Sequence, residues 1–273
     1  MSSFLSGPRP RTFGHRGASG THPENTLVSF RAAMERGAAA LELDVHRTAD
    51  GAVVVHHDDT LERTTNGQGP VRERTLEELR ALDAGYRFSP DGGKTFPFRG
   101  TGVTIPTLEE VCKAVPHTPL IIEVKQSDPP LERDLAQVLQ STGTDSWALV
   151  FSLYQEPVDR FRALKHGCPT GFGPDDVSRF LQRVEENRWD GYRPPGVAFA
   201  VPVRWHVTRI VTPRFVDAAH DKGCEVYVWT VNEPGEMHAL LDMGVDGLIT
   251  DFPERLTRVL AERAGGPETG DRT

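Results

Sequence analysis

Three acidic residues stand at spacings that would bring their carboxylates together inside a protein. Glu42 and Asp44 lie two positions apart in the run 40–46, and Glu123 lies in the apolar run 120–124. Side chains two apart on a β-strand share a face, so Glu42 and Asp44 would point one way and their apolar neighbours the other. Buried carboxylates are costly unless cations pair with them. Oxygen ligands of this kind suit one hard divalent cation, Mg²⁺ or Ca²⁺ with Mn²⁺ also eligible, better than zinc.

A segment with two adjacent histidines is predicted to fold back over these acids. Asp50-Gly51 is a favoured two-residue hairpin turn. With these two residues as the loop, Asp44 stands opposite His57, and directly opposed side chains lie on the same face. His57 would then lie over the carboxylates, whereas a one-residue bulge would put His56 there instead.

The elements that would position these residues are short β-type runs alternating with helical patterns, which is typical of βαβ units. The expected strands are 11–14, 40–46, 120–125, 148–153, 170–173, 196–201, 225–231 and 247–250. The expected helices are 24–36, 107–114, 131–140, 156–166, 174–187, 212–222, 234–243 and 253–264. Eight such units favour an α/β fold, a (β/α)₈ TIM barrel, whose active site forms at the C-terminal ends of the strands.

One stretch interrupts the alternation. The segment 50–106 is too long for a simple strand-to-helix loop, and it carries a candidate strand, 53–57, and a candidate helix, 76–82. We read it as a small insertion after the second strand, at the catalytic end of the barrel. The expected organisation is a single domain over residues 1–264 that includes this inserted segment, followed by a disordered tail, 265–273.

Composition excludes several classes of protein. The net charge of −8 and the lack of a clustered Lys/Arg run argue against a nucleic-acid partner and against stable membrane association. The three cysteines are odd in number and form no Cys-x-x-Cys pair, so a disulfide framework or thiolate zinc site is not expected. No apolar run is long enough for a membrane span, and we expect a cytoplasmic protein. Oligomeric state is not readable from the sequence.

A series of short motifs stands in order along the chain. The motifs are His15-Arg16-Gly17, Pro23-Glu24-Asn25-Thr26, Glu42-x-Asp44, Asp50-Gly51, His57-Asp58, Arg63-Thr64-Thr65-x-Gly67, Pro106-Thr107-Leu108-Glu109-Glu110, Glu123-Val124-Lys125, Trp229-Thr230-Val231-Asn232 and Gly244-Val245-Asp246-Gly247-Leu248-Ile249-Thr250-Asp251. Together they resemble the motif series of the glycerophosphodiester phosphodiesterase family. The resemblance runs from about residue 12 to 257, and the ordered set is far more specific than any one motif. The segment 201–212 departs from the commonest family pattern, and we expect no site residue there.

The resemblance implies metal-dependent hydrolysis of a glycerophosphodiester to glycerol 3-phosphate and an alcohol, with either water or a substrate hydroxyl as the attacking group. Imidazole, with an unperturbed pKa of about 6.5, suits both proton transfers. The implied general acid and base are His15 and His57. The implied ligands of one divalent cation are Glu42, Asp44 and Glu123. The implied substrate-binding residues are Arg16, Lys125, Trp229 and Asn25.

Some of these residues also suit structural roles. Glu24 and Asn25 stand where a helix would open, so capping competes with a role in the site. Asp246 and Asp251 are expected to close the last strand and its turn. Trp229 fits a packing role as well as an apolar wall for the substrate.

The alternative activity is lysophospholipase D-like hydrolysis of lysophospholipids on the same barrel. It would require exposed apolar side chains at the mouth of the site. The insertion could supply four aromatic residues for this purpose: Tyr86, Phe88, Phe96 and Phe98. Net charge favours a soluble small-molecule phosphodiester instead. A sugar isomerase or aldolase barrel would not call for Arg16 and Lys125, two cations aimed at an anion. A binding protein with a decayed site would not keep the full set of expected catalytic residues.

Overall fold

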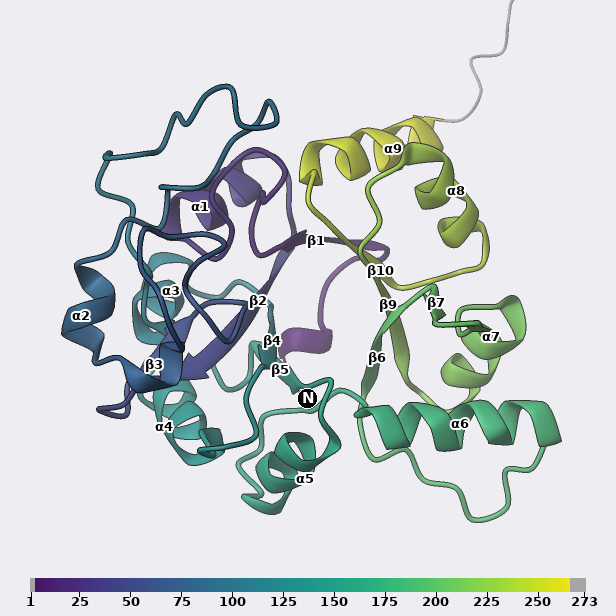
Figure 1. Cartoon of the computed structure of the whole chain (residues 1–273). Helices are drawn as coiled ribbons and strands as arrows, with labels where there is room; N and C mark the ends of the chain where they lie inside the picture. Colours follow the sequence, from purple (N-terminus) through teal and green to yellow (C-terminus); the bar gives the residue numbers. More distant parts are fainter. Residues whose placement is uncertain (1–2, 266–273) are drawn as a thin grey trace, which may run out of the picture.

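Seven parallel strands form the wall of a barrel in the computed structural model of the chain, which describes residues 3–265. Hydrogen bonds join neighbouring strands in the order β5, β4, β2, β1, β10, β9, β6. In Figure 1 the helices surround these strands. The strands are β1 (Arg11–His15), β2 (Ala40–Arg47), β4 (Leu120–Val124), β5 (Ala148–Phe151), β6 (Ala198–Pro202), β9 (Glu225–Trp229) and β10 (Gly247–Thr250).

Two residues close the ring between β5 and β6. Thr170 forms a parallel bridge to Val150, and Gly171 forms one to Ala198. The predicted strand 170–173 is therefore wrong in extent, because a proline precedes it and helix α6 begins directly after it. The predicted TIM barrel is confirmed, with its eighth strand reduced to this bridge.

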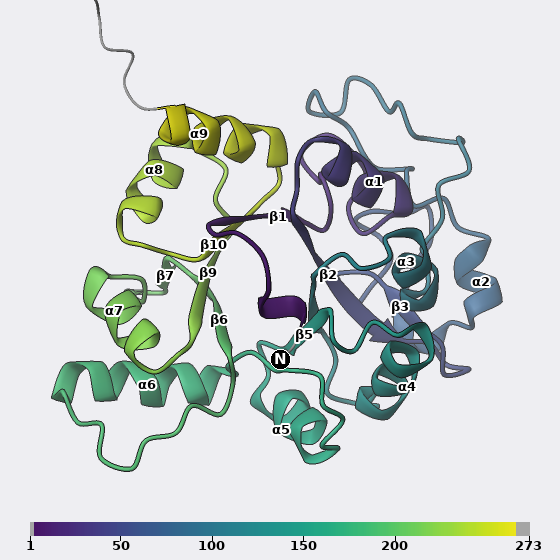
Figure 2. The same ribbon diagram turned by 180° about the vertical axis from the view of Figure 1, so that it is seen from behind.

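An outer ring of helices covers the strands, as Figure 1 and the reverse view in Figure 2 both show. The predicted helix 24–36 begins three residues late, because Thr26 is its N-cap and accepts the Ser29 N–H while Asn25 has a positive φ of 57°. The capping box of Thr107 and Glu110 forms as expected. The helices of the ring are α1 (Leu27–Glu35), α3 (Leu108–Ala114), α4 (Glu132–Thr142), α5 (Gln155–Ala163), α6 (Pro174–Glu186), α7 (Pro213–Asp221), α8 (Pro234–Asp242) and α9 (Pro253–Gly265).

The two faces of each strand pack into different cores. Leu41, Leu43 and Val45 of β2 join the cluster under the helices, as predicted from their alternation with the acids. A separate cluster that includes Ala40 fills the barrel interior, and Phe4 of the short 3₁₀ helix η1 (Ser3–Leu5) belongs to it. The N-terminal end of the barrel is thus closed by apolar packing, and the polar residues of the strands are left at the C-terminal end.

The insertion folds against β2 as a small subdomain. It contains β3 (Val53–Val55), the 3₁₀ helix η2 (Val71–Glu73) and α2 (Leu76–Arg80). Its apolar side chains form a core of their own, centred on Val54, Leu61 and Leu79. The segment therefore holds its shape by packing rather than by hydrogen bonds to the barrel alone.

The predicted register of the β2–β3 hairpin is wrong by one residue. Val45 pairs with Val55, so Asp44 stands opposite His56, whose N–H donates to the Asp44 carbonyl. The loop is longer than Asp50-Gly51 because Thr48 pairs with Ala52 and its hydroxyl donates to the Asp50 carboxylate at 2.6 Å. This side-chain bond widens the turn to three residues.

A second, shorter hairpin follows β6. It consists of β7 (Arg204–Trp205) and β8 (Thr208–Arg209). Between residues 3 and 265 no helix combines the length and the apolar character needed to cross a bilayer. Of the predicted tail 265–273, Gly265 ends α9 and the remainder lies outside the described residues.

Candidate active site

The three predicted metal ligands converge at the C-terminal end of the barrel. Each of Glu42, Asp44 and Glu123 offers a carboxylate oxygen, and these oxygens lie within 4.8 Å of one another. Asp44 on β2 is the register partner of Glu123 on β4. All three side chains are buried.

The electrostatics of this acidic cluster call for positive charge. Burial and the neighbouring Asp44 carboxylate raise the pKa of Glu42, and the same two causes raise the pKa of Glu123 to about 7. Three buried oxygen donors with this mutual repulsion fit a hard divalent cation, which would lower both pKa values. The donor set therefore fits the predicted divalent cation.

Two cations flank the acidic cluster. Lys125 Nζ lies 3.0 Å from a Glu123 oxygen and 3.7 Å from an Asp44 oxygen. Arg16 Nε lies 3.3 Å from the other Asp44 oxygen, and the backbone N–H of Arg16 donates to the Glu42 carboxylate at 3.1 Å. These two positive charges oppose three acidic groups, so they do not balance the cluster, and both remain beside the cavity where an anion would bind.

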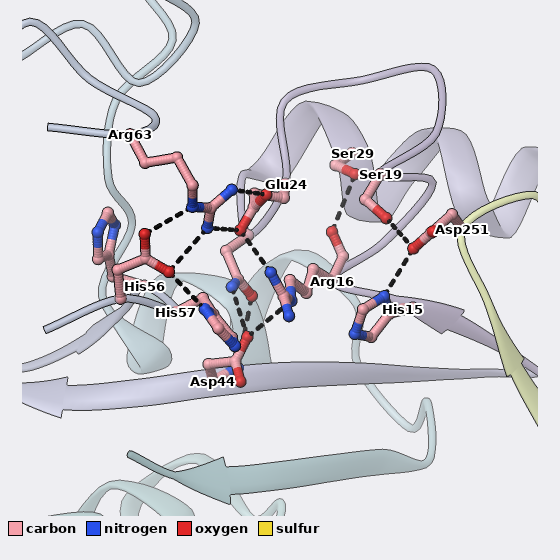
Figure 3. A network of polar contacts seen from close by, with 12 residues as sticks. His15, Arg16, Ser19, Glu24, Ser29, Asp44, His56, His57, Arg63 and Asp251 are labelled. Carbon is pink, nitrogen blue, oxygen red and sulfur yellow. Dashed lines mark hydrogen bonds and ion pairs between the residues drawn. The ribbon is translucent and has the colours of Figure 1, made fainter. Parts of the chain in front are cut away.

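The two predicted catalytic histidines have matching environments. His15 Nδ1 lies 2.6 Å from a carboxylate oxygen of Asp251, and His57 Nδ1 lies 2.6 Å from one of Asp58. Each carboxylate accepts a hydrogen bond from Nδ1, which places the proton of a neutral ring on Nδ1 and leaves Nε2 unprotonated. The Nε2 of His15 lies 3.9 Å from Glu42, and that of His57 lies 3.2 Å from Lys125 Nζ. Figure 3 shows the two imidazoles on different sides of Asp44.

His57 reaches the site although the predicted hairpin register was wrong. Strand β3 ends at Val55, so strict alternation stops there, and the chain bends over residues 57–59. His56 is buried in the insertion, with Nε2 on the Thr60 carbonyl, whereas His57 lines the cavity. Burial lowers the pKa of the His57 imidazole. His46 lies on the same face of β2 as Glu42 and Asp44, and its Nε2 lies 3.2 Å from the His57 carbonyl oxygen.

An ion-pair chain ties the insertion to the loop after β1. Arg63 donates to both Asp58 and Glu24, and Glu24 also accepts from Arg16 at 2.8 Å. Burial would raise the pKa of Glu24, but hydrogen bonds and charge from Arg63 and Arg16 lower it to about 2. Figure 3 shows this chain reaching from Arg63 to Arg16 through Glu24. It fixes His57 and Arg16 relative to each other.

Three residues of this network had no site role in the sequence analysis: Asp58, Arg63 and Asp251. The first two stand inside motifs quoted for the family resemblance, and adjacency of a carboxylate to His57 is a signal that could have found Asp58. Asp251 was assigned to strand closure. No local signal links it to His15, because 236 positions separate them and only the closed barrel joins β10 to β1.

Asn25 and Trp229, both predicted to bind substrate, lie in different places. The Asn25 amide donates to Asp44 at 2.8 Å, and Asn25 is absent from the lining of the cavity. The structure thus places it behind a predicted metal ligand. Trp229 lines the cavity, and its buried Nε1 has no hydrogen-bond acceptor among the described residues.

One cavity of about 90 Å³ gathers most of these side chains at the mouth of the barrel. A space of this size, with acids, cations and imidazoles on its wall, can hold a small anionic group beside the two imidazoles. Its lining residues are His15, Arg16, Glu42, His57, Glu123, Lys125, Phe151, Leu153, Trp229, Thr230 and Ile249.

Comparison with known proteins identifies the family of the chain. The profile of the glycerophosphoryl diester phosphodiesterase family matches residues 15–145 and 182–255. A glycerophosphodiester phosphodiesterase of Caldanaerobacter subterraneus subsp. tengcongensis is 32% identical over 262 residues, which cover 92% of this chain and 97% of that protein. One of Bacillus subtilis (strain 168) is 32% identical over 266 residues, covering 94% and 88%.

A solved structure of a phosphodiesterase has a similar fold. An Oleispira antarctica phosphodiesterase, determined in complex with the product sn-glycerol-3-phosphate, superposes with a TM-score of 0.75 at 26% identity, over 93% of this chain and 98% of that one. Profile, relatives and fold agree over most of the chain, and the chain belongs to the glycerophosphodiester phosphodiesterase family of phosphoric diester hydrolases.

Proposed function

We propose that this chain hydrolyses glycerophosphodiesters to glycerol 3-phosphate and an alcohol, with His15 and His57 as general acid and base. The observation that carries the proposal is the pair of imidazoles in one cavity, each with Nδ1 held by a carboxylate. In-line displacement at phosphorus needs one group to take a proton from the attacking oxygen and another to protonate the leaving oxygen. Two oriented imidazoles on different sides of the acidic cluster meet that need.

The acids and cations serve the phosphate. Glu42, Asp44 and Glu123 would hold one divalent cation, which when bound neutralises phosphate charge and makes phosphorus more electrophilic. Arg16 and Lys125 face the same cavity and would bind the non-bridging oxygens as negative charge grows on them.

Two further residues complete the proposed site. Trp229 Nε1, buried without an acceptor, would donate to an oxygen of the bound substrate while its ring walls the cavity. Asn25 would act indirectly, because its amide fixes the orientation of Asp44. The related Oleispira phosphodiesterase holds sn-glycerol-3-phosphate as product, which supports glycerol 3-phosphate as the product here.

Turnover of glycerophosphocholine, with and without EDTA, tests the proposal. We expect glycerol 3-phosphate and choline to form only when a divalent cation is present. The metal-dependent mechanism would be rejected if protein dialysed against EDTA still turned over the substrate. It would also be rejected if Mg²⁺, Ca²⁺ and Mn²⁺ all failed to support turnover.

A further inference from the structure

The β7–β8 hairpin is a separate two-stranded sheet outside the barrel. Every residue from 204 to 209 is exposed, and at the turn Val207 is 93% exposed while Trp205 beside it is 50% exposed. The base of the hairpin is held in place, because Ile210 is buried and its N–H donates to the Val203 carbonyl at 3.0 Å. The hairpin therefore presents two large apolar side chains to water from an anchored base.

The third exposed large hydrophobic of residues 3–265 lies at the same end of the barrel. Tyr154, in the loop after β5, is 51% exposed. Its neighbour Leu153 lines one groove together with Trp205, so this loop and the hairpin adjoin each other. Both segments follow the C-terminal ends of barrel strands, as the catalytic cavity does. Exposed apolar side chains that gather in one place mark an interaction surface more strongly than scattered ones.

Arginines stand between these apolar side chains. Arg204 pairs with Arg209 across the hairpin, and both are exposed. Arg209 Nε donates to the Val211 carbonyl at 3.1 Å, and among residues 3–265 neither hairpin arginine forms an ion pair. No acidic residue occurs from position 191 to position 216, a stretch that also contains Arg193 and Arg214. In a chain with a net charge of −8, this edge is locally positive.

This combination of side chains matches the chemistry of an anionic lipid surface. Aromatic rings with a polar tip favour the boundary between water and hydrocarbon, and an apolar tip such as Val207 gains by leaving water. Each arginine near an anionic bilayer strengthens binding by about fivefold. Acidic groups on the far side of the protein oppose this little, because salt screens charges beyond about 8 Å.

We propose that this docking edge, made of Tyr154, Arg204, Trp205, Val207 and Arg209, binds reversibly to the surface of an anionic lipid bilayer. Val207 and Trp205 enter the headgroup region, and the two arginines contact lipid phosphates. The contact determines where the protein sits and leaves the diester substrate in water. It does not depend on the proposed function, because none of these five residues lines the catalytic cavity.

Flotation of the full chain with vesicles tests the proposal. One set of vesicles is phosphatidylcholine alone, and the other is phosphatidylcholine mixed with phosphatidylglycerol. The protein should float with the mixed vesicles at low salt and stay behind with the neutral ones, and physiological salt should weaken binding by about tenfold. Brominated lipid in the mixed vesicles should quench tryptophan fluorescence, and this quenching should be lost in Trp205→Phe.

Variants of exposed residues locate the contact. Val207→Asp should abolish vesicle binding, because it places a charge where an apolar side chain enters the bilayer. Arg204→Gln and Arg209→Gln should each weaken binding by about fivefold. Lys165→Gln is the charge-matched control, since Lys165 is exposed and follows the end of α5, at the end of the barrel opposite the hairpin.

Circular dichroism and hydrolysis of glycerophosphocholine without vesicles should be unchanged in the four charge variants, which separates docking from folding and from catalysis. Equal binding to neutral and mixed vesicles overturns the proposal, and so does an equal loss in Lys165→Gln and Arg204→Gln. A second copy of the chain is the competing occupant of this edge. Sedimentation velocity that shows a wild-type dimer abolished by Val207→Asp, with no vesicle binding, would assign the edge to self-association and reject the lipid surface.

Discussion

Replacement of Asp251 by Asn tests whether a carboxylate from the last strand positions His15. Asp251 Oδ1 lies 2.6 Å from His15 Nδ1, and the same carboxylate accepts from Ser19 at 2.7 Å and from Asn232 at 2.6 Å. Burial would raise the pKa of Asp251, but these hydrogen bonds and the charge of His15 lower it to about 2. The group is therefore ionised throughout any ordinary assay. Asparagine keeps the shape and removes the charge.

The expected loss of kcat follows from the energy of the hydrogen bond between Asp251 and His15. A hydrogen bond to a charged group contributes roughly 1.5–3 kcal/mol, and about 1.4 kcal/mol changes a rate tenfold. If that bond orients His15 and stabilises its protonated form, kcat should fall by about 10- to 150-fold. The Michaelis constant should change little, because Asp251 is not part of the cavity lining.

The assay is steady-state hydrolysis of glycerophosphocholine with saturating divalent cation, together with thermal unfolding and metal titration of the variant. Ser19→Ala is the matched control, since it removes a single neutral donor to the same carboxylate and should cost no more than about fivefold. A kcat within twofold of wild type would refute the positioning role. Equal losses in kcat and metal affinity would point instead to collapse of the site.

Three further predictions concern the same network. His15→Ala and His57→Ala should each lower kcat by about 10²–10⁴-fold with circular dichroism unchanged, and an unaltered rate would remove that residue from the mechanism. Mg²⁺ or Ca²⁺ should raise the melting temperature of the wild type but not of Asp44→Asn, since binding to the folded state alone stabilises it; equal shifts would place the ion elsewhere. Glu24→Gln should lower the free energy of unfolding by up to about 3 kcal/mol above pH 4.5, measured in urea. Because Glu24 has a depressed folded-state pKa, its contribution is present above 4.5 and lost as the pH falls to about 2, so a pH-independent difference would contradict the assignment.

Local pattern predicted the strands that hold the acidic cluster, because apolar and acidic residues alternate along them with the period of a β-strand. Leu41, Leu43 and Val45 face the helices and Glu42 and Asp44 face the barrel mouth, as a period of two requires. The capping box at Thr107 formed for the same kind of reason, since its two hydrogen bonds join residues three apart.

Predictions failed where a few side-chain bonds outweighed the pattern. The β2–β3 register shifted because the Thr48 hydroxyl binds Asp50, and the helix predicted from Glu24 began at Leu27 because Thr26 caps it. Both differences arise from single hydrogen bonds of about 1 kcal/mol, which composition and periodicity do not resolve.

The sequence by itself determined the barrel, the family and the residue types of the site, since these follow from repeated local units and from motifs contiguous in the chain. Only the tertiary structure decided which groups support them. Asp251 meets His15 because closure of the barrel brings β10 beside β1, and Arg63 joins Glu24 to Asp58 because the insertion folds back on the loop after β1. Contacts between distant segments depend on how the whole chain packs, and no spacing along the chain encodes them.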